Sequence, residues 1–505
     1  MARRPLLIEV VARRTTAEAI DAYRDPHPAT DLVEFRLDGI VDLKLDRILE
    51  ARGRPKLLTV RSRAQGGAAG PEDRAALLRR LLRSGAEYVD LESGDVGARD
   101  LFRPGGPKRV LSWHDPHGTP IDLEERAARL LAVPGVDLVK VVTWAEVTGD
   151  NLRYRDLLRA APRGRLIAFA MGPKGVPSRI LAAAWGSAAL FAPRSGAPAS
   201  AAGQIPIEDL EEVYRWRGIA PTTTLLGVLG APVGGSMSPR LHNAGLEALG
   251  LDMRYLPFEA SSVAEFLPVL SDLRLRGLSV THPFKEAILP HLDGLDADAR
   301  ACGAVNTVVK VWNRLEGRNT DLEASVAPLR GWLRLRGARV GVLGAGGAAR
   351  ALALALRRRG ARVTVFSRTP ERGRALARAT GVLARGWAGA RGFRGDLVVN
   401  ATPVGMTPRP ARTPIPATWL KTPRYYALIY NPIETLLMRR AQAIGLEARG
   451  GLEMFVAQGA AQFSEFTGRE APIAAMRRAV TRALEASAPP SRRAATGAKE
   501  RHADR

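Results

Sequence analysis

The chain is poor in cysteine and has no long apolar run. Cys302 is the only cysteine among 505 residues, which excludes a disulfide framework or a cysteine-built metal site and favours a reducing cytoplasm. No uninterrupted apolar stretch is long enough to cross a membrane. Glu9 and the pair Arg13 and Arg14 interrupt the first apolar run, so we expect no signal peptide. We therefore expect a cytoplasmic protein without a metal ion or a membrane partner.

Acidic residues are scarce relative to basic ones. The 75 lysines and arginines outnumber the 51 aspartates and glutamates and leave a formal net charge of +24. The arginines are spread over every predicted helix, and no basic cluster is interleaved with aromatic residues, which argues against a nucleic-acid partner. A positive field of this kind favours small anionic ligands. Nothing in the composition predicts the oligomeric state.

Eight apolar runs of strand length occupy the first part of the chain, mostly separated by amphipathic segments. Eight strands that alternate with helices predict a (β/α)8 barrel, in which catalytic side chains gather at the C-terminal ends of the strands. The predicted strands are 6–12, 32–37, 56–60, 87–91, 109–113, 136–142, 165–170 and 188–192, and the clearest helices are 73–83, 123–131, 178–185 and 207–217.

Two neighbouring strands carry side chains suited to catalysis. Lys140 lies within the β-branched run 136–142, where burial disfavours the charged form and produces a nucleophilic amine. His114 follows the preceding strand, and histidine moves protons near neutral pH. Either residue alone has a structural alternative, a lysine that reaches solvent or a hydrogen-bonded core histidine. Their common position at the ends of barrel strands favours catalysis.

Charged residues are also predicted to face the barrel interior. Glu34 and Arg36 alternate with apolar residues along strand 32–37, so both share the face that does not meet the helices. Arg61 ends the third strand, and Arg179 opens the helix after the seventh. These charges indicate a polar ligand or compensating ion pairs, and the small residues of the loop 195–204 can close over a ligand.

These features resemble type I 3-dehydroquinate dehydratase over about residues 5 to 217. The resemblance implies that Lys140 forms an imine with the C3 ketone of 3-dehydroquinate, while His114 removes the C2 proton and then protonates the departing C1 hydroxyl. It also implies that Glu34 positions the histidine and the substrate. Gln65 stands where the family often has glutamate. The residues that carry the likeness are 34–36, Arg61, Gly66, Gly67, 112–115, Thr119, Pro120, Lys140, Met171, Gly172, Ser178 and Arg179; the implied substrate ligands are Arg36, Arg61, Arg179, Ser200 and Gln204.

A second domain is predicted after a linker at 218–224. Its landmark is the strand 339–343, which leads into a glycine turn and then into the helix 351–359. Glycines let a pyrophosphate approach the backbone, and the helix N-terminus favours the anion, so this pattern predicts a Rossmann-type dinucleotide site.

The following strand indicates which dinucleotide binds. It ends near Ser367, Arg368 and Thr369, with no acid to hold a ribose 2′-hydroxyl. Arg368 and Arg372 can instead pair with a 2′-phosphate, although both have the alternative of being surface charges. We therefore predict NADP rather than NAD. The predicted cofactor-binding residues are Gly344, Gly346, Gly347, Ala348, Ser367, Arg368, Thr369, Arg372, Thr402 and Gly451.

Residues 224 to 483 resemble shikimate dehydrogenase. The likeness is carried by the segments 236–239, 277–285, 303–307, 319–321, 400–406, 430–435 and 451–458. It implies that Lys285 and Asp321 act as a pair that moves the proton at the C3 oxygen while hydride passes between C3 and the nicotinamide. The other implied substrate ligands are Ser236, Ser238 and Thr281 for the carboxylate, and Asn306, Tyr430 and Gln458 for the hydroxyls and ring.

Taken together, these patterns predict an α/β protein with an N-terminal (β/α)8 barrel, followed by a two-lobed dehydrogenase with a Rossmann-type NADP lobe. The predicted domains are 1–220 and 221–485, the latter with a substrate lobe at 224–333, an NADP lobe at 334–450 and returning C-terminal helices; 486–505 is a predicted disordered basic tail. The predicted function is dehydration of 3-dehydroquinate followed by NADPH-dependent reduction of 3-dehydroshikimate. Two alternatives stay open, a non-catalytic regulatory homologue and a Schiff-base lyase joined to an NAD-linked quinate dehydrogenase.

Overall fold

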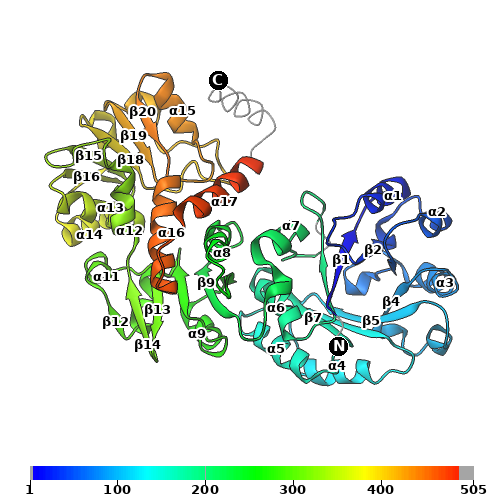
Figure 1. Cartoon of the computed structure of the whole chain (residues 1–505). Coiled ribbons are helices and arrows are strands. Elements are labelled where there is room, and N and C mark those ends of the chain that lie inside the picture. The colour runs from blue at the N-terminus through cyan, green and yellow to red at the C-terminus, as the bar shows by residue number, and fades with distance from the viewer. Residues whose placement is uncertain (1–3, 199–200, 488–505) are drawn as a thin grey trace. The chain divides into compact units, whose positions relative to one another are not determined.

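The first eight strands of the computed structural model, which describes residues 4–198 and 201–487, form one parallel sheet that curls into a barrel (Figure 1). Neighbours follow the order β7-β6-β5-β4-β3-β2-β1-β8. In the described chain β7 and β8 are linked by a backbone hydrogen bond from Ala188 to Leu166 but not by strand pairing, so the barrel is nearly closed. The strands are β1 (Leu6–Val11), β2 (Leu32–Arg36), β3 (Lys56–Thr59), β4 (Tyr88–Glu92), β5 (Lys108–Asp115), β6 (Leu138–Trp144), β7 (Leu166–Met171) and β8 (Ala189–Ala192).

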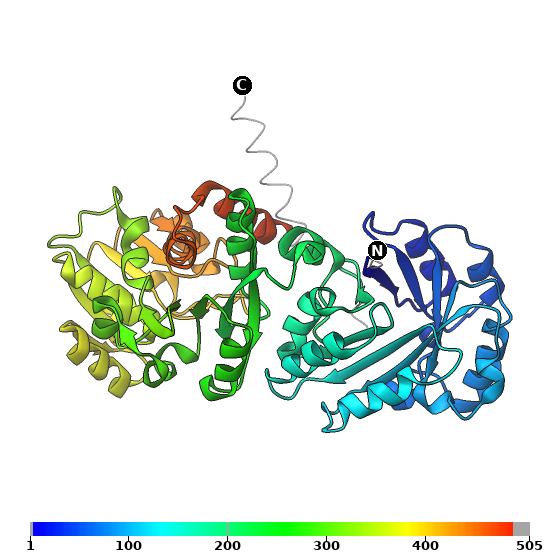
Figure 2. The same cartoon turned by 60° about the horizontal axis from the view of Figure 1, so that its bottom comes forward.

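Helices surround these strands on the outside (Figure 2). Each strand is almost wholly buried because helices cover its outer face and side chains fill the interior. The helices are α1 (Thr16–Arg24), α2 (Leu45–Glu50), α3 (Pro71–Leu81), α4 (Leu123–Leu131), α5 (Asp150–Ala160), α6 (Val176–Trp185) and α7 (Ile207–Asp209).

The predicted helix at 207–217 is wrong in its length. Helix α7 ends at Asp209, and the chain continues through a π turn, Leu210–Tyr214, and a 3-10 turn, Trp216–Gly218. Arg215 adopts a left-handed backbone with φ of 45°, which no α-helix tolerates. This turn buries Trp216 completely and lets its indole N–H donate to Glu211.

The chain divides into two compact units. The first contains Met1–Leu225, Ala231–Gly235 and Asp252–Leu275, and therefore holds β10 (Met253–Glu259) and α9 (Val263–Asp272) in addition to the barrel. The second contains Leu226–Gly230, Ser236–Leu251 and Arg276–Arg505. The predicted domain boundary near residue 220 stays a prediction.

One sheet of the second unit carries the strand order β9-β11-β13-β14-β12. Strands β9 and β11 are parallel, whereas β13 runs antiparallel to both of its neighbours. Its strands are β9 (Thr224–Gly230), β11 (Gly277–Val280), β12 (Gly294–Leu295), β13 (Thr307–Val311) and β14 (Arg314–Arg318), and the helices of this region are α8 (Ser238–Ala248), α10 (Phe284–Ala287), α11 (Ala297–Cys302) and α12 (Asp321–Val326).

The other sheet of this unit is fully parallel and has the order β17-β16-β15-β18-β19-β20. Because β15 lies between β16 and β18, the strand order reverses at the end of β15, where doubly wound sheets bind nucleotides. The elements are β15 (Arg339–Leu343), α13 (Gly347–Arg358), β16 (Arg362–Ser367), α14 (Pro370–Thr380), β17 (Leu383–Gly386), β18 (Leu397–Asn400), β19 (Arg424–Ala427), α15 (Leu436–Ala443) and β20 (Glu447–Arg449). The predicted start of helix α13 is wrong by four residues, since the helix already begins at the glycine turn.

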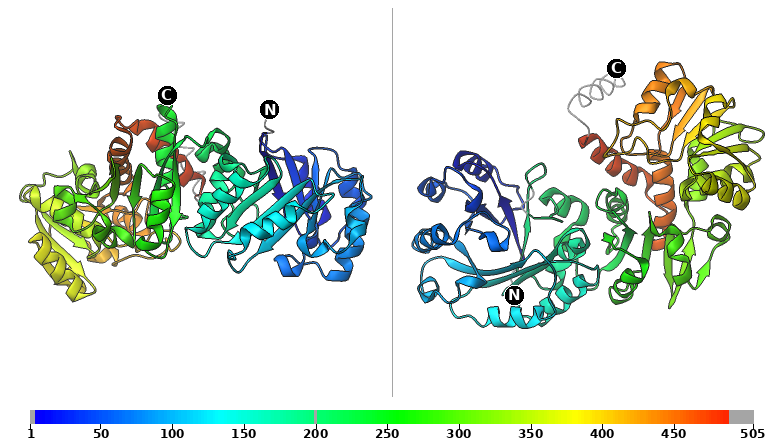
Figure 3. Two further views of the ribbon diagram at one scale, coloured as in Figure 1. Left: turned by 90° about the horizontal axis from the view of Figure 1, so that it is seen from below. Right: turned by 180° about the vertical axis from the view of Figure 1, so that it is seen from behind.

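The last two helices, α16 (Leu452–Thr467) and α17 (Ile473–Ala486), both pack against α8 (Figure 3). Two glycines let α16 lie close to α8 and to β11. A Cβ on Gly245 of α8 would lie 2.8 Å from Phe463, and one on Gly277 of β11 would lie 2.2 Å from Phe466. The chain thus returns from the nucleotide-type sheet to the first sheet of the unit. None of the helices within 4–198 and 201–487 has the length and hydropathy to cross a membrane.

Candidate active sites

Lys140 lies on β6 with its side chain buried, at 6 % exposure. Its Nζ sits 3.6 Å from the centroid of the Phe191 ring, and no carboxylate of the described residues lies within ion-pair distance. Burial lowers the pKa of Lys140 to about 8, and the neighbouring Glu34 only partly opposes this effect. The structure therefore holds a lysine whose neutral amine is accessible near physiological pH.

His114 follows on the adjacent strand, β5, which pairs with β6 so that Ser112 faces Lys140 and His114 faces Val142. Burial, and then the positive charges of Arg61, Lys140, Arg36 and Arg179, hold the pKa of His114 well below its usual value. A neutral imidazole is the form that accepts a proton. The predicted lysine and histidine therefore share one cationic environment inside the barrel.

The predicted arginines are fixed in different ways. Arg61 is buried and forms ion pairs with Asp90 at 2.9 Å and with Glu92 at 3.2 Å. Arg36 pairs with Asp38 through two hydrogen bonds of 3.0 Å. Both guanidinium groups are thus held by acids of the barrel interior, and each still carries donors in excess of these partners. Sequence reasoning missed Asp38, Asp90 and Glu92, although all three follow the same inward alternation as Glu34.

Glu34 is buried on β2 and accepts a hydrogen bond of 2.8 Å from the Thr59 hydroxyl. The predicted contact from Glu34 to His114 is not among the hydrogen bonds of the described residues. Instead, the His114 ring meets Gln65, whose Oε1 lies 3.0 Å from Nδ1. Sequence reasoning had noted Gln65 as a departure from the family pattern without giving it a role.

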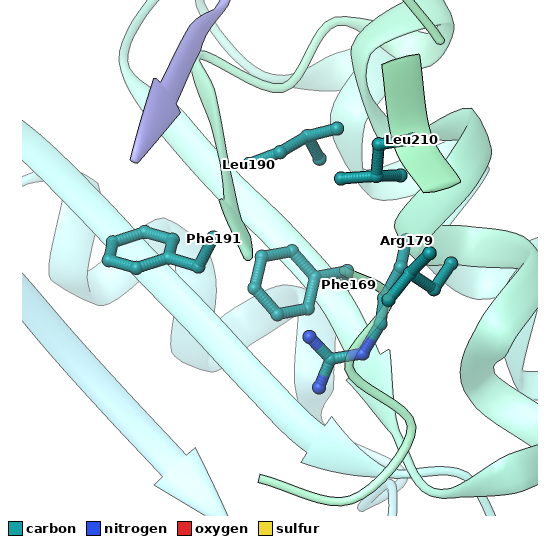
Figure 4. Close-up of a pocket in the computed structure, with 6 residues that line it drawn as sticks. Phe169, Arg179, Leu190, Phe191 and Leu210 are labelled. Atoms are coloured by element: carbon teal, nitrogen blue, oxygen red, sulfur yellow. The ribbon is translucent and has the colours of Figure 1, made fainter. Parts of the chain in front are cut away.

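Arg179 lies near the start of α6 with its guanidinium 4.6 Å from the Phe169 ring centroid (Figure 4). Burial lowers its pKa to about 10, and an anionic ligand would relieve the cost of burying this charge. Its side chain donates to the Ala202 carbonyl at 3.3 Å, and Gly203 packs on Gly172 so closely that a Cβ would lie 2.5 Å from the Gly172 oxygen. Gln204 belongs to this loop, whereas Ser200 lies outside the described residues.

The second unit contains an open cleft with a volume of about 240 Å³. All eight residues that the sequence predicts for substrate and proton transfer line it, together with Ala348 from the glycine turn. The predicted lining residues are Ser236, Ser238, Thr281, Lys285, Asn306, Asp321, Tyr430 and Gln458.

Lys285 and Asp321 form an ion pair of 2.5 Å in this cleft. Lys285 belongs to the short helix α10 and Asp321 is the first residue of α12, so two helix starts bring the pair together. The lysine side chain is 24 % exposed and the aspartate side chain 9 %. This arrangement places an amine that opens to the cleft against a buried carboxylate.

A network of amides forms the floor of the cleft. Gln462 accepts from the Ser279 hydroxyl at 2.8 Å and donates to the Asn306 carbonyl at 2.8 Å. Asn306 in turn donates to the Thr320 hydroxyl at 2.9 Å, beside Asp321. Gln462 escaped sequence reasoning, although it follows Gln458 by four residues and so shares its helix face. Tyr430 stacks on Phe455 with ring centroids 4.1 Å apart, and burial raises its pKa.

The glycine turn has the geometry of a dinucleotide site. Gly344 has φ of 110°, and its Cβ would lie 3.0 Å from Thr402, so only glycine fits this position. A Cβ on Gly346 or Gly347 would meet no described protein atom within 4 Å, which leaves space in front of the N-terminus of α13. The first N–H groups of this helix lack intrahelical acceptors, so the residues present fit a pyrophosphate.

The turn after β16, where we predict the 2′-phosphate to bind, carries positive charge without an acidic partner among the described residues. Arg368 and Arg372 are exposed, and in the described part of the chain neither forms an ion pair; Arg368 lies 5.9 Å from the Trp387 ring centroid. Ser367 bonds the Thr369 carbonyl and fixes this turn. Gly451 is the residue just before α16, and a Cβ on it would lie 2.1 Å from the Leu428 oxygen. Of the predicted cofactor residues, Gly344, Gly346, Gly347 and Ala348 thus lie between the end of β15 and the first turn of α13, and Ser367, Arg368 and Thr369 lie at the end of β16.

Four family models match this chain in sequence order. A type I 3-dehydroquinase model matches residues 9–221, and a shikimate dehydrogenase substrate binding domain matches 228–308. A model described as NADP oxidoreductase, coenzyme F420-dependent, matches 339–412, and a shikimate 5′-dehydrogenase C-terminal domain matches 451–481.

A relative from Arabidopsis thaliana, named bifunctional 3-dehydroquinate dehydratase/shikimate dehydrogenase, chloroplastic, is 34 % identical over 92 % of this chain and 82 % of its own length. The chain belongs to this bifunctional family. The shikimate biosynthesis protein AroDE of Chlamydia pneumoniae is 30 % identical over 86 % of this chain and 89 % of its own. A shikimate dehydrogenase (NADP(+)) of Oleidesulfovibrio alaskensis is 44 % identical over 52 % of this chain and 95 % of its own.

The predictions of family, fold class and enzyme class are therefore confirmed: the protein is a bifunctional enzyme of the shikimate pathway, a lyase joined to an oxidoreductase. The predicted NADP cofactor agrees with the name of the Oleidesulfovibrio relative and with the NADP oxidoreductase model over the Rossmann-type sheet. The roles of individual residues are not tested by these matches and stay predictions.

Proposed function

We propose that the barrel dehydrates 3-dehydroquinate through an imine on Lys140. The observation that carries this proposal is the buried Lys140, with a pKa of about 8, on the strand next to a histidine that burial keeps neutral. The neutral amine attacks the C3 ketone and water leaves. The resulting iminium acidifies the C2 hydrogen, His114 accepts that proton, and the proton then goes to the C1 hydroxyl as it departs as water. A water molecule then hydrolyses the product imine, which releases 3-dehydroshikimate and regenerates the Lys140 amine.

The cations of the barrel hold the substrate in this scheme. Arg179 binds the carboxylate, with Ser200 and Gln204 from the loop after β8. Arg36 and Arg61 keep their acidic partners and offer their remaining N–H groups to hydroxyls. Glu34 lies near enough to Lys140 to raise its pKa against the effect of burial, so it balances the charge of the iminium and binds a substrate hydroxyl.

In the second unit we propose reduction of 3-dehydroshikimate to shikimate. Bound NADPH supplies the hydride, with its pyrophosphate at the glycine turn and its 2′-phosphate on Arg368 and Arg372. The Lys285 and Asp321 pair delivers a proton to the C3 oxygen as it becomes a hydroxyl. Ser236, Ser238 and Thr281 hold the carboxylate, while Asn306, Tyr430 and Gln458 place the ring.

The decisive experiment is incubation of the purified protein with 3-dehydroquinate and NADPH. We expect shikimate to appear with one NADPH oxidised for each molecule formed. NADPH oxidation with added 3-dehydroshikimate but not with 3-dehydroquinate would overturn the barrel's role. The reverse failure, accumulation of 3-dehydroshikimate without oxidation, would overturn the second unit's role.

We also propose that the protein is cytoplasmic and that its partners are these small anions alone. The support is the single cysteine, Cys302, which is buried and whose pKa burial raises to about 11, so the thiol is unreactive. Cell fractionation with antibody detection tests the location. Recovery in a membrane or organelle fraction would contradict it.

A further inference from the structure

The histidine of the barrel has a partner that fixes which of its two nitrogens carries a proton. Gln65 Oε1 lies 3.0 Å from the backbone nitrogen of His114 and 3.0 Å from Nδ1 of its ring. A backbone N–H only donates, so the atom of Gln65 that faces His114 is the amide oxygen. An amide oxygen only accepts, so Nδ1 must carry the hydrogen and Nε2 is left as the unprotonated nitrogen.

The loop that carries Gln65 is built to hold this position. It leaves the end of β3, turns at Gly66 with φ of 81°, and folds back until a Cβ on Gly67 would lie 2.1 Å from the Arg61 oxygen. Ala69 donates to the Arg61 carbonyl at 3.2 Å, and Ala68 donates to Asp38 at 3.2 Å. The loop is thus bonded to the ends of β3 and β2, and Gln65 lies at its centre.

The partner is uncharged in a strongly charged surrounding. The carboxylates nearby already serve other cations, since Asp38 pairs with Arg36, and Asp90 and Glu92 pair with Arg61. No acid of the described residues pairs with the ring of His114. The charges that act on the ring are those of Arg61 after β3, Lys140 from β6, Arg36 from β2 and Arg179 from α6. The acids of this region act on those cations: Glu34 and Asp90 on Lys140, Asp38 on Arg36, and Glu92 on Arg61.

We propose that Gln65 is a positioning residue of the dehydration: it holds His114 in the tautomer with hydrogen on Nδ1, aims Nε2 at the substrate, and adds no charge that would stabilise the imidazolium. This inference rests on the proposed role of His114 as proton carrier. A glutamate at the same place would accept the same two hydrogen bonds but would also favour the protonated ring, which is no longer a base. Gln65 therefore extends the neutral form of His114 to lower pH.

The test is Gln65→Glu, which preserves the shape of the side chain. The quantity to measure is kcat of dehydration as a function of pH. In the imine complex Lys140 no longer titrates, so the acidic limb of this profile reports the protonation of His114. We expect the acidic limb to move up by about one pH unit or more. Gln442→Glu, an exposed position on α15, adds the same charge to the other unit and should leave the profile unmoved. An unmoved profile in Gln65→Glu would overturn the inference.

A second variant separates positioning from charge. Gln65→Leu removes the acceptor, so we expect kcat of dehydration to fall about tenfold or more with little change in KM, because the base is misoriented and not the substrate. The ¹⁵N signals of the His114 ring should change from a single Nδ1–H tautomer to a mixture. Unchanged signals with unchanged kcat would overturn the inference. If the protein without substitutions does not dehydrate 3-dehydroquinate, the proposed function of the barrel is refuted instead.

Discussion

The two units place their candidate catalytic lysines in opposite surroundings, and we expect the two lysines to differ in chemistry for that reason. Lys140 is buried over the Phe191 ring without a carboxylate partner, and burial lowers its pKa to about 8. Lys285 is partly exposed and paired with Asp321 at 2.5 Å. The first arrangement favours the neutral amine, which attacks carbonyl carbon. The second holds the lysine against a carboxylate at the cleft, the pair for which we propose proton transfer to oxygen.

This contrast shows that residue type does not decide the chemistry. Lys140 is the third residue of β6, and Lys285 lies in the short helix α10 that follows β11. Lys140 is only 6 % exposed inside the barrel, whereas the Lys285 side chain is 24 % exposed and lines the cleft of the second unit. An acid beside Lys140 would hold it protonated, and an apolar neighbour in place of Asp321 would leave Lys285 without its proton relay.

The largest effect we predict is that of Lys140→Ala on dehydration. Loss of a covalent nucleophile should lower kcat/KM by about 10⁴-fold or more, while reduction of added 3-dehydroshikimate stays unchanged. Borohydride added with 3-dehydroquinate should attach a substrate-sized mass to the peptide with Lys140, detected by mass spectrometry. Lys56→Ala is the matched control, since Lys56 is also a buried barrel lysine but donates to the Leu49 carbonyl at 3.1 Å. A label on Lys56 would refute the assignment.

Lys285→Ala should have the next largest effect and the opposite selectivity. Loss of a general acid should lower kcat of reduction by about 10²- to 10⁴-fold and leave dehydration intact. Asp321→Asn should cost a similar factor, and the double variant little more, because the two residues act as one titrating pair. Arg358→Ala removes an exposed pair with Asp298 in the same unit and serves as control. Additive losses would show that the two residues act separately.

The contrast also predicts a pH dependence for the barrel lysine. Lysine attacks only as the free base, so imine formation should fall as pH drops below the pKa of about 8. Between pH 8 and pH 6 the neutral fraction falls roughly 50-fold, and the initial rate of borohydride trapping in single-turnover mixtures should fall with it. A rate that continues to rise steeply from pH 8 to pH 10 would mean that Lys140 keeps its ordinary pKa.

How far the sequence predicts these sites depends on how local their causes are. Strand periodicity located all eight barrel strands within about two residues of their observed ends, and the glycine turn at Gly344 was visible because its cause is backbone geometry. Gln65 was not predicted to contact His114, since that contact depends on a loop from another strand. Gln462 was missed because its partners, Ser279 and Asn306, lie far away in the sequence. The predicted length of the helix at 207–217 was wrong because burial of Trp216 overrides the local helical periodicity.

The smallest effect we predict concerns the second unit alone. It tests whether the Rossmann-type lobe distinguishes the 2′-phosphate of NADPH from the 2′-hydroxyl of NADH. Arg368 is exposed, has no acidic partner among the described residues and lies beside Trp387 at the turn after β16. Arg368→Ala should therefore raise KM for NADPH about tenfold and leave KM for NADH nearly unchanged, because only NADPH carries the 2′-phosphate. Arg374→Ala is the matched control, an arginine of the same helix start that pairs with Glu371 at 3.0 Å. Equal losses with both cofactors would make Arg368 an adenosine contact or a surface charge, and the discrimination would then rest on Arg372.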